Sequence, residues 1–412
     1  MYSDEFYSAY ISDLSKTRRK SPKSTLTIGG PGSSADLSEA LQYGFTQGHT
    51  DLVEWISDFQ ARAHQRPQDG SWKLSIGAGS QDLLYKAFLA LTNPGDSVLI
   101  EAPVYAGVIP LLISAKANLI EIATDHNGIE ASSLRSILEA WPPNKPLPKY
   151  LYTVPYGCNP SGATASLERR RQVLTLARKY KFLILEDDPY YWMYYGDAPR
   201  SPSYFKLEAQ EPSEEGTGLV LRFDSFSKIL SSGLRIGFAS GPAPLLGVMN
   251  SHTASANLQP SSLSQSVTLA ILRHWGSDGF IAHTEQVSKF YRQRKEVFEA
   301  AMYKHMVDDD GTMMAEWTSP VSGMFLWFKL LISPNLFGEI TTIVDDEGDS
   351  KTLIETNAFE AGVLALPGTV FFAIGRKTAY VRVSFSVLND ADTWEAVRRL
   401  SVVVREARKA KR

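Results

Sequence analysis

A lysine between two small hydroxyl residues is the strongest candidate for chemistry in the chain. Residues 222–238 read RFDSFSKILSSGLRIGF, so Lys228 follows Ser225 and Ser227, and Arg235 comes shortly after. A lysine amine that is held in a pocket binds its proton less tightly and can act as a nucleophile. Hydroxyl groups beside an arginine suit an anionic ligand such as a phosphate. The stretch therefore indicates a reactive amine next to an anion site.

Three other stretches carry polar side chains where predicted strands end. Residues 77–81 (GAGSQ) place Ser80 and Gln81 at the start of a helix, whose N–H groups favour a phosphate. Asn159 lies in CNPSG, and residues 185–191 (LEDDPYY) supply two acids and two tyrosines. Each stretch alone has an ordinary explanation as a helix cap, a turn or a solvated surface. Their order at successive strand ends favours one shared site.

The elements that position these residues alternate between strands and helices. Short apolar strands are predicted at 96–101, 118–123, 149–155 and 182–187, and a helix follows each of the first three. Such alternation is typical of a mostly parallel sheet with helices on both faces, where ligands gather at the carboxyl ends of the strands. After residue 240 a long amphipathic helix and short strands predict a second, α+β domain.

The combination of groups matches what pyridoxal phosphate requires. A helix N-terminus, hydroxyls and an arginine hold its phosphate, and Lys228 forms a Schiff base with its aldehyde. A carboxylate keeps the ring nitrogen protonated, and an asparagine with a tyrosine hydrogen-bonds the ring oxygen. Two Asp–Tyr pairs at the same spacing could supply this carboxylate and this tyrosine: Asp187 with Tyr190, and Asp188 with Tyr191.

Composition argues against several other classes of protein. The chain has 412 residues, a net charge of −3 and one cysteine, which excludes an intramolecular disulfide and a cysteine-rich zinc site. The small net charge gives no general attraction for nucleic acid or an anionic membrane. There is no apolar run of about 18 residues, and the first residues lack the apolar core of a secretory signal. P-loop, HExxH and GxSxG motifs are absent, and GAGSQDL lacks the third glycine of a dinucleotide-binding loop. We therefore expect a cytoplasmic protein that binds no metal, nucleic acid or membrane.

The chain resembles the fold-type I pyridoxal-phosphate enzymes, and among them the kynurenine/2-aminoadipate (aromatic amino acid) branch of the class I/II aminotransferases. The resemblance runs from about residue 41 to 390 and rests on GAGSQDLLYKAF, EAPVYAG, CNPSG, ILEDDPYY, SFSKILSSGLRIGF, SGMFLW, GVLALPGTVFF and YVRVSFS, in that order. It implies an α/β, aspartate aminotransferase-like fold: a large domain with a mostly parallel seven-stranded sheet flanked by helices, plus a smaller α+β domain. The implied divisions are 1–48 for an N-terminal arm joining the small domain, 49–300 for the large cofactor-binding domain and 301–412 for the C-terminal small domain.

The resemblance implies a cofactor site with Lys228 as the catalytic amine. The family's register assigns Asp187 to the ring nitrogen and Tyr190 to the ring oxygen, in preference to Asp188 and Tyr191. The implied cofactor-binding set is Tyr43, Ser80, Gln81, Tyr105 (stacked on the ring), Asn159, Asp187, Tyr190, Ser225, Ser227, Lys228 and Arg235.

Substrate and partner contacts are implied at further positions. Arg382, in YVRVSFS, matches the arginine that clamps the substrate α-carboxylate, and Asn159 also contacts the substrate. Tyr43 matches a residue that reaches the partner subunit's site, so a homodimer with shared active sites is implied. Phe325 and Phe371 either line an aromatic pocket or belong to the core, and we favour the core for Phe325.

The implied reaction moves an amino group between an aromatic or 2-aminoadipate-like amino acid and a 2-oxo acid, with Lys228 transferring the α-carbon proton. Two alternatives remain open: a lyase (C–S cleavage or β-elimination) or cyclase on the same scaffold, and a non-catalytic ligand sensor. The sensor is disfavoured because no catalytic position is missing. Residues 28–44 are shorter than the corresponding stretch of the family, which predicts a wider or differently covered substrate pocket.

Overall fold

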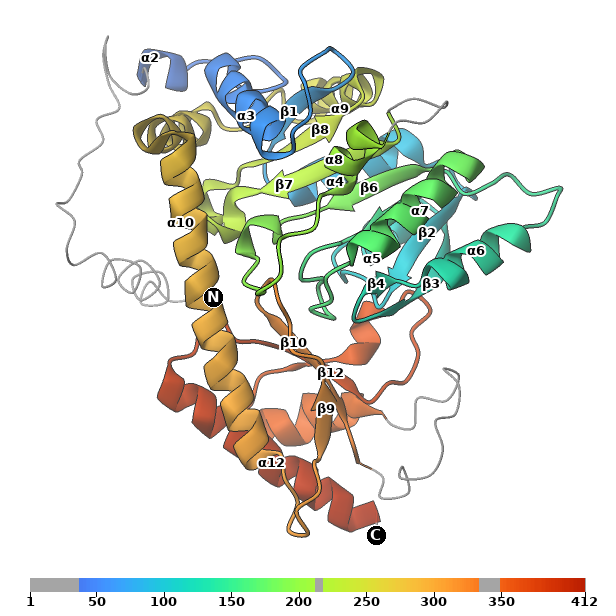
Figure 1. Ribbon diagram of the computed structural model, residues 1–412, viewed down its shortest axis with the longest axis vertical. Helices are drawn as coiled ribbons and strands as arrows, with labels where there is room; N and C mark the ends of the chain where they lie inside the picture. Colours follow the sequence, from blue (N-terminus) through green and yellow to red (C-terminus); the bar gives the residue numbers. More distant parts are fainter. Residues whose placement is uncertain (1–36, 212–217, 333–348, 412) are drawn as a thin grey trace.

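The computed structural model describes residues 37–211, 218–332 and 349–411, so most of the expected N-terminal arm lies outside the described residues. Two sheets organise the chain (Figure 1). The larger has eight strands in the order β1-β8-β7-β6-β5-β2-β3-β4, and the smaller has four in the order β11-β12-β10-β9. The strands of the larger sheet are β1 (Lys73–Gly77), β2 (Ser97–Ala102), β3 (Asn118–Asp125), β4 (Gly128–Ile129), β5 (Tyr150–Thr153), β6 (Leu183–Asp187), β7 (Val220–Ser225) and β8 (Gly237–Gly241).

The larger sheet confirms the expected fold and adds one short strand. The pairs β2–β3, β2–β5, β5–β6 and β6–β7 are parallel, whereas β8 runs antiparallel to both β1 and β7. The eighth strand, β4, has two residues and pairs antiparallel with the end of β3 across a turn in which Asp125 Oδ1 accepts from Asn127 N–H (2.8 Å). Seven strands were expected, and this turn accounts for the additional one.

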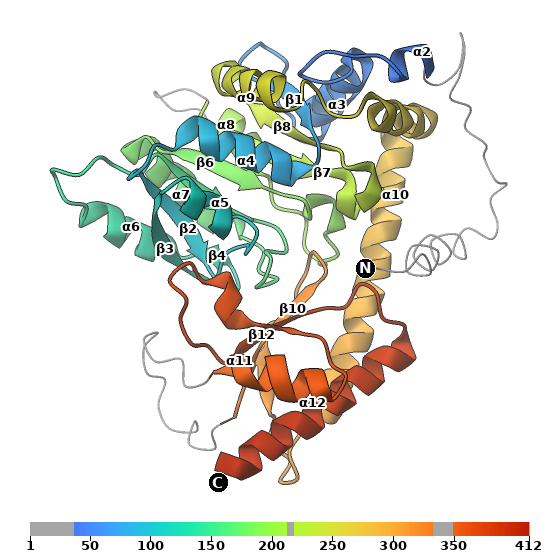
Figure 2. The same cartoon turned by 180° about the vertical axis from the view of Figure 1, so that it is seen from behind.

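Helices cover both faces of the larger sheet, as the alternating pattern predicts. Figure 1 shows α6, α7 and α8 in front of the strands, and the reverse view in Figure 2 shows α4 and α5 in front of the opposite face. Every residue of β2, β5, β7 and β8 is buried, which is expected of strands with helices on both sides. The helices up to the middle of the chain are α2 (Leu37–Ala40), α3 (Thr50–Ala63), α4 (Ser80–Leu91), α5 (Ile109–Ser114), α6 (Ala131–Glu139), α7 (Leu167–Tyr180), α8 (Tyr204–Gln210) and α9 (Ala243–Ala256).

A long helix, α10 (Ser262–His305), connects the two parts of the molecule (Figure 1). Gly276 interrupts its helical backbone with φ 63° and ψ 178°. The expected domain limit at residue 300 falls inside α10, and the three domain ranges remain predictions. The smaller sheet follows, with α12 packed against α10. Its elements are β9 (Ala315–Trp317), β10 (Phe325–Leu330), α11 (Ser350–Thr352), the π-helix η4 (Leu353–Ala358), β11 (Leu366–Pro367), β12 (Tyr380–Ser384) and α12 (Asp390–Lys411).

None of the helices within the described residues is long and apolar enough to cross a membrane.

Candidate active site

The carboxyl ends of three parallel strands contact the smaller sheet and its loops. In the loop after each of β2, β5 and β6, one residue forms a hydrogen bond with a residue of the C-terminal part. These contacts are Val104 N–H to the Phe371 carbonyl (2.8 Å), Arg382 Nη1 to Asn159 Oδ1 (2.9 Å) and the Ser322 hydroxyl to the Tyr190 carbonyl (2.9 Å). In α/β sheets, ligands bind at the carboxyl ends of the strands, which is the edge described here.

Lys228 lies at the end of β7, in a short 3₁₀ turn η2 (Phe226–Lys228). The turn forms because Ser225, which is buried, accepts a hydrogen bond from the Ser227 N–H through its hydroxyl (3.2 Å). Lys228 is partly buried, and its amine has no hydrogen-bond or ion-pair partner among the described residues. Burial lowers the pKa of the amine, and the cations Arg235 and Arg382 lower it further. A larger share of the amine is therefore neutral, as a nucleophile requires.

Arg235 and the start of α4 form an anion cradle beside Lys228. Arg235 Nη1 donates to the Ser227 hydroxyl, and Nη2 donates to the Ala78 carbonyl, both at 3.2 Å. The N-cap of α4 is Gly79, which has no side chain to cap the helix, so the first N–H groups are available to a ligand. A Cβ on Gly79 would lie 2.4 Å from Arg235 Nη2, so the arginine can approach the helix only over a glycine.

Asp187 and Asp188 point to different partners, which separates the two Asp–Tyr pairs. Asp187 is buried, its Oδ2 accepts from the Tyr152 hydroxyl (2.7 Å), and its Oδ1 has no partner among the described residues. Burial raises the pKa of Asp187 to about 7. Asp188 Oδ2 instead accepts from Arg222 Nη1 (2.8 Å), and Arg222 also bonds both oxygens of Asp224. Each aspartate keeps a buried Oδ1 without a partner among the described residues. Asp188 is nevertheless bound into a buried ion cluster through Arg222, whereas the hydrogen bond of Asp187 comes from the neutral Tyr152 hydroxyl.

The two tyrosines follow the same division. The Tyr190 ring meets Phe325 edge-on, with centroids 6.0 Å apart. Burial raises the Tyr190 pKa, and the charge of Asp187 is the next largest cause. Tyr191 packs away from them, against Trp192 and beneath the Arg222 guanidinium. The geometry thus favours the Asp187–Tyr190 register.

Arg382, on β12, presents a held guanidinium to this space. Its carbon lies 4.4 Å from the centroid of Phe325 and 5.2 Å from that of Phe371, so two rings flank it. Nη1 donates to Asn159, and Nε is buried without a partner among the described residues. Both phenylalanines are buried, as favoured for Phe325, and both also contact this functional side chain.

Tyr105 faces the same space from the loop after β2. It is partly buried, and burial raises the pKa of its phenol. Asp187 raises that pKa further, whereas Arg382 and Arg235 lower it, which places the ring among these charges. Gln81 Nε2 donates to the Gly107 carbonyl (2.9 Å), so the Gln81 amide is directed to this loop.

Tyr43, another predicted site residue, lies at the surface of the single chain. Its side chain is 83% exposed. Two residues of this group escaped sequence reasoning, Tyr152 and Arg222. Their only sequence signal is position, a tyrosine inside the apolar stretch 149–155 and an arginine inside a buried strand.

The assembled groups suit a phosphorylated ligand with a basic ring nitrogen and a carbonyl carbon. With such a ligand the cradle would hold the anion, Asp187 would accept from the ring nitrogen, the Lys228 amine would be placed for the carbonyl carbon, and Arg382 would be available to a carboxylate. No three His, Cys, Asp or Glu side chains within the described ranges lie together as a metal site would require.

Comparison with known proteins identifies the family. The family model for aminotransferase class I and II matches residues 15–400. The aminotransferase tdiD of Emericella nidulans is 38% identical over 370 residues, which cover 90% of this chain and 80% of that protein. The mitochondrial kynurenine/alpha-aminoadipate aminotransferase of Bos taurus is 36% identical over 384 residues, 90% of this chain and 84% of its own length.

Solved structures resemble the chain over nearly its whole length. The kynurenine aminotransferase of Pyrococcus horikoshii superposes with a TM-score of 0.78 at 27% identity, covering 98% of this chain and 95% of that one. The aminotransferase Aro9 of C. albicans gives a TM-score of 0.82 at 26% identity, covering 94% and 85%. With this agreement of family, sequence and fold, the chain belongs to the class I and II aminotransferases.

Proposed function

We propose that this pyridoxal-phosphate-dependent aminotransferase exchanges an amino group between an aromatic or 2-aminoadipate-type amino acid and a 2-oxo acid. One observation carries the site assignment: three polar groups face one space without partners among the described residues. Two of them, Asp187 Oδ1 and Arg382 Nε, are buried atoms. The third is the amine of the partly buried Lys228, whose pKa responds to both of the other residues. Buried polar atoms are rarely left without a partner, so a ligand that completes all three is expected.

The residues present fit pyridoxal phosphate. Ser80, Ser227 and Arg235 would hold the phosphate together with the first N–H groups of α4, and Asp187 Oδ1 would accept from the ring nitrogen. The ring would be contacted by Asn159 and Tyr190, and Tyr105 would lie over it. The set would be completed by Ser225 and Gln81 beside the cradle. When bound, the cofactor supplies an electron sink that weakens the bonds to the substrate α-carbon.

The chain's own residues then divide the work. Arg382 binds the substrate α-carboxylate with its planar fork, which fixes the orientation of the α-carbon. The neutral Lys228 amine takes the proton from the α-carbon and later returns a proton, as a general base and then a general acid. Asp187, as the anion, keeps the proton on the ring nitrogen throughout.

Two features support an aromatic or 2-aminoadipate-type substrate. Tyr105, Tyr190, Phe325 and Phe371 surround Arg382 with aromatic surface. The Bos taurus relative is named a kynurenine/alpha-aminoadipate aminotransferase, and a Schizosaccharomyces pombe relative, 31% identical over 389 residues, is named an aromatic amino acid aminotransferase.

The test is an absorption titration of the cofactor-loaded protein with single amino acids. We expect an aromatic amino acid or 2-aminoadipate to convert the aldehyde form of the cofactor to the amine form, and a 2-oxo acid to restore it. Release of ammonia and an oxo acid with no acceptor present, or a ring-closed product, would instead assign the chain to the lyase or cyclase alternative.

A homodimer with shared active sites is part of the proposal. Three large apolar side chains in one short stretch are exposed, Leu41 (67%), Tyr43 (83%) and Phe45 (68%). Burial of such a stretch against a second copy would bring Tyr43 to that copy's cofactor. Sedimentation should show a dimer that Tyr43→Ala weakens, whereas Tyr303→Ala, at a 63% exposed tyrosine of α10, should leave the mass unchanged. A monomer with full activity would overturn the dimer.

We also propose a cytoplasmic location. The one cysteine, Cys158, is a buried free thiol, which suits a reducing compartment. Three mammalian relatives carry the word mitochondrial in their names, so cell fractionation against markers of both compartments is the deciding measurement.

A further inference from the structure

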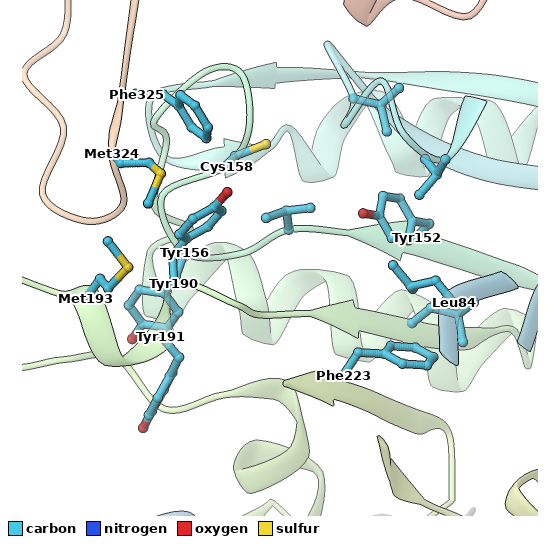
Figure 3. Close-up of a cluster of buried hydrophobic side chains, with 14 of the residues drawn as sticks. Leu84, Tyr152, Tyr156, Cys158, Tyr190, Tyr191, Met193, Phe223, Met324 and Phe325 are labelled. Carbon is cyan, nitrogen blue, oxygen red and sulfur yellow. The ribbon is translucent and has the colours of Figure 1, made fainter. Parts of the chain in front are cut away.

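Tyr152 and Asp187 form a hydrogen bond inside the larger sheet, on neighbouring strands. The Tyr152 hydroxyl donates to Asp187 Oδ2 at 2.7 Å, and the two residues are 0% and 4% exposed. Tyr152 pairs in register with Leu185 of β6, so its side chain reaches forward to the end of that strand. In Figure 3 the Tyr152 hydroxyl points toward the side where Tyr190 and Phe325 lie. The bond therefore reaches from the core to the edge of the site.

The bond leaves the carboxylate with two unlike oxygens. Oδ2 is occupied by a neutral donor, while Oδ1 is buried and has no partner among the described residues. The Tyr152 ring cannot easily swing away, because Phe88 of α4 packs edge-on against it with centroids 5.9 Å apart. A carboxylate that is held at one oxygen is fixed in one orientation about its χ2 bond.

We propose that Tyr152 is a positioning residue for the cofactor, which fixes the Asp187 carboxylate so that Oδ1 faces the ring nitrogen. This inference rests on the role proposed above for Asp187. Without the Tyr152 hydroxyl, the carboxylate is free to turn and Oδ2 becomes a buried acceptor without a donor.

Loss of the Tyr152 hydrogen bond also affects the charge of Asp187, and this effect weakens cofactor binding as well. Burial is the largest cause of its raised pKa, and the Tyr152 hydrogen bond is the largest cause that opposes it. Loss of the bond raises the pKa further, so the acid stays protonated to higher pH and pairs less well with a protonated ring nitrogen. The titratable and charged groups that face Asp187 are Tyr152, Asp224, Glu101, Arg222, Tyr105, Tyr190 and Lys228.

The same strand offers a matched control. Tyr150 is equally buried, its hydroxyl bonds the Thr92 hydroxyl at 2.7 Å, and its ring stacks on Phe88. Tyr150→Phe thus removes a phenol hydrogen bond of the same length from β5 without touching Asp187. Any loss that is common to the two variants reports stability, and a loss seen only at Tyr152 reports positioning.

The experiment measures the dissociation constant of pyridoxal phosphate from the apoprotein between pH 5 and pH 9, with thermal melting of each apoprotein alongside. We expect Tyr152→Phe to raise the dissociation constant at least about tenfold at pH 7 and to move the acidic limb of binding to higher pH. Tyr150→Phe should change the constant less than about twofold. Equal constants and equal pH limbs for the two variants would overturn the proposal.

A double-mutant cycle shows whether Tyr152 acts through Asp187. Asp187→Asn should weaken binding by itself, and adding Tyr152→Phe to it should weaken binding no further. Additive losses would place the effect of Tyr152 elsewhere and overturn the inference. Normal binding by Asp187→Asn would instead defeat the role proposed for Asp187, so the two failures are distinguishable.

Discussion

Arg222 and Asp188 form a buried ion pair at 2.8 Å, one residue along the chain from the carboxylate proposed to hold the cofactor ring. Both side chains are 0–1% exposed, and Arg222 also pairs with Asp224 at 2.7 Å. The sequence offers two adjacent aspartates with the same spacing to a tyrosine, and this ion pair distinguishes them. Asp188 neutralises an arginine in the core, which supports Asp187 as the carboxylate proposed for the ligand.

Substitution of the two aspartates should therefore have opposite consequences. Asp187→Asn should lower kcat about 10²–10³-fold, because a neutral amide does not hold the proton on the ring nitrogen. Asp188→Asn should lower the free energy of unfolding by about 1–3 kcal/mol, with a smaller effect on kcat of the folded protein. Denaturant unfolding and steady-state kinetics of both variants measure this, and equal kinetic losses would contradict the assignment.

The raised pKa of Asp187 predicts how the stability of the apoprotein varies with pH. Its pKa is about 7 in the folded chain and 3.8 ordinarily, so between these values the folded state binds more protons than the unfolded state. The contribution of Asp187 to stability is thus present below about pH 4 and is lost as pH rises through about 7. An asparagine side chain in its place has no proton to lose.

Apoprotein carrying Asp187→Asn should consequently gain stability relative to the wild type as pH rises from 4 to 8. The gain has a ceiling of about 4 kcal/mol, from about 1.4 kcal/mol per pH unit. Thermal melting of both apoproteins across this range checks the sign. A relative gain toward acid pH would show that the wild-type carboxylate is ionised in the apoprotein.

Strands and helices were predicted well where apolar runs are long and bounded by turns. The predicted strand at 96–101 became Ser97–Ala102, and the helix predicted to follow the strand at 149–155 became Leu167–Tyr180. Its N-terminus is set by the Ser166 hydroxyl, which accepts from the Arg169 N–H (3.3 Å). These elements follow from local propensity and capping, which a sequence displays directly.

Other features depend on packing between distant segments and left little local signal. Strand β8 (Gly237–Gly241) consists mostly of small residues and shows no apolar pattern in the sequence. It is buried because β1, β7 and α4 pack around it. The contact between Tyr152 and Asp187 needs two strands in register, and Tyr43 would acquire a function only beside another chain. Such relationships are visible only in three dimensions.

Removal of the Lys228 amine should abolish turnover without unfolding the chain. Lys228→Ala should lower kcat about 10⁴-fold or more, because it removes the amine proposed to move the α-carbon proton. Some cofactor should remain, held by the cradle at Arg235. Lys289→Ala, at an exposed lysine of α10, is the control and should retain wild-type kinetics. Normal rates in Lys228→Ala would refute the assignment.

A side chain at Gly79 should push Arg235 aside, because its Cβ would fall 2.4 Å from Nη2 at the flexible end of that arginine. Gly79→Ala should displace the guanidinium and raise the dissociation constant of the cofactor at least about tenfold. Gly70→Ala is a matched control, since Gly70 has φ +86° against +91° for Gly79 and nothing within 4 Å of its Cβ. It should cost only about 1–2 kcal/mol of stability from the backbone conformation. Equal cofactor affinity in both variants would remove Arg235 from the cradle.

Arg382 should control the affinity for both substrates more than the affinity for the cofactor. Its fork forms two parallel hydrogen bonds to a carboxylate, which an ammonium group cannot reproduce. Arg382→Lys should lower kcat/KM for the amino acid and for the oxo acid by about 10²-fold each, while cofactor binding stays within about threefold of the wild type. Arg376→Ala is the control, because Arg376 also stacks on a phenylalanine, 3.9 Å from the Phe372 centroid, but is exposed. Loss for only one of the two substrates would contradict a shared α-carboxylate site, since both carry that group in the same position.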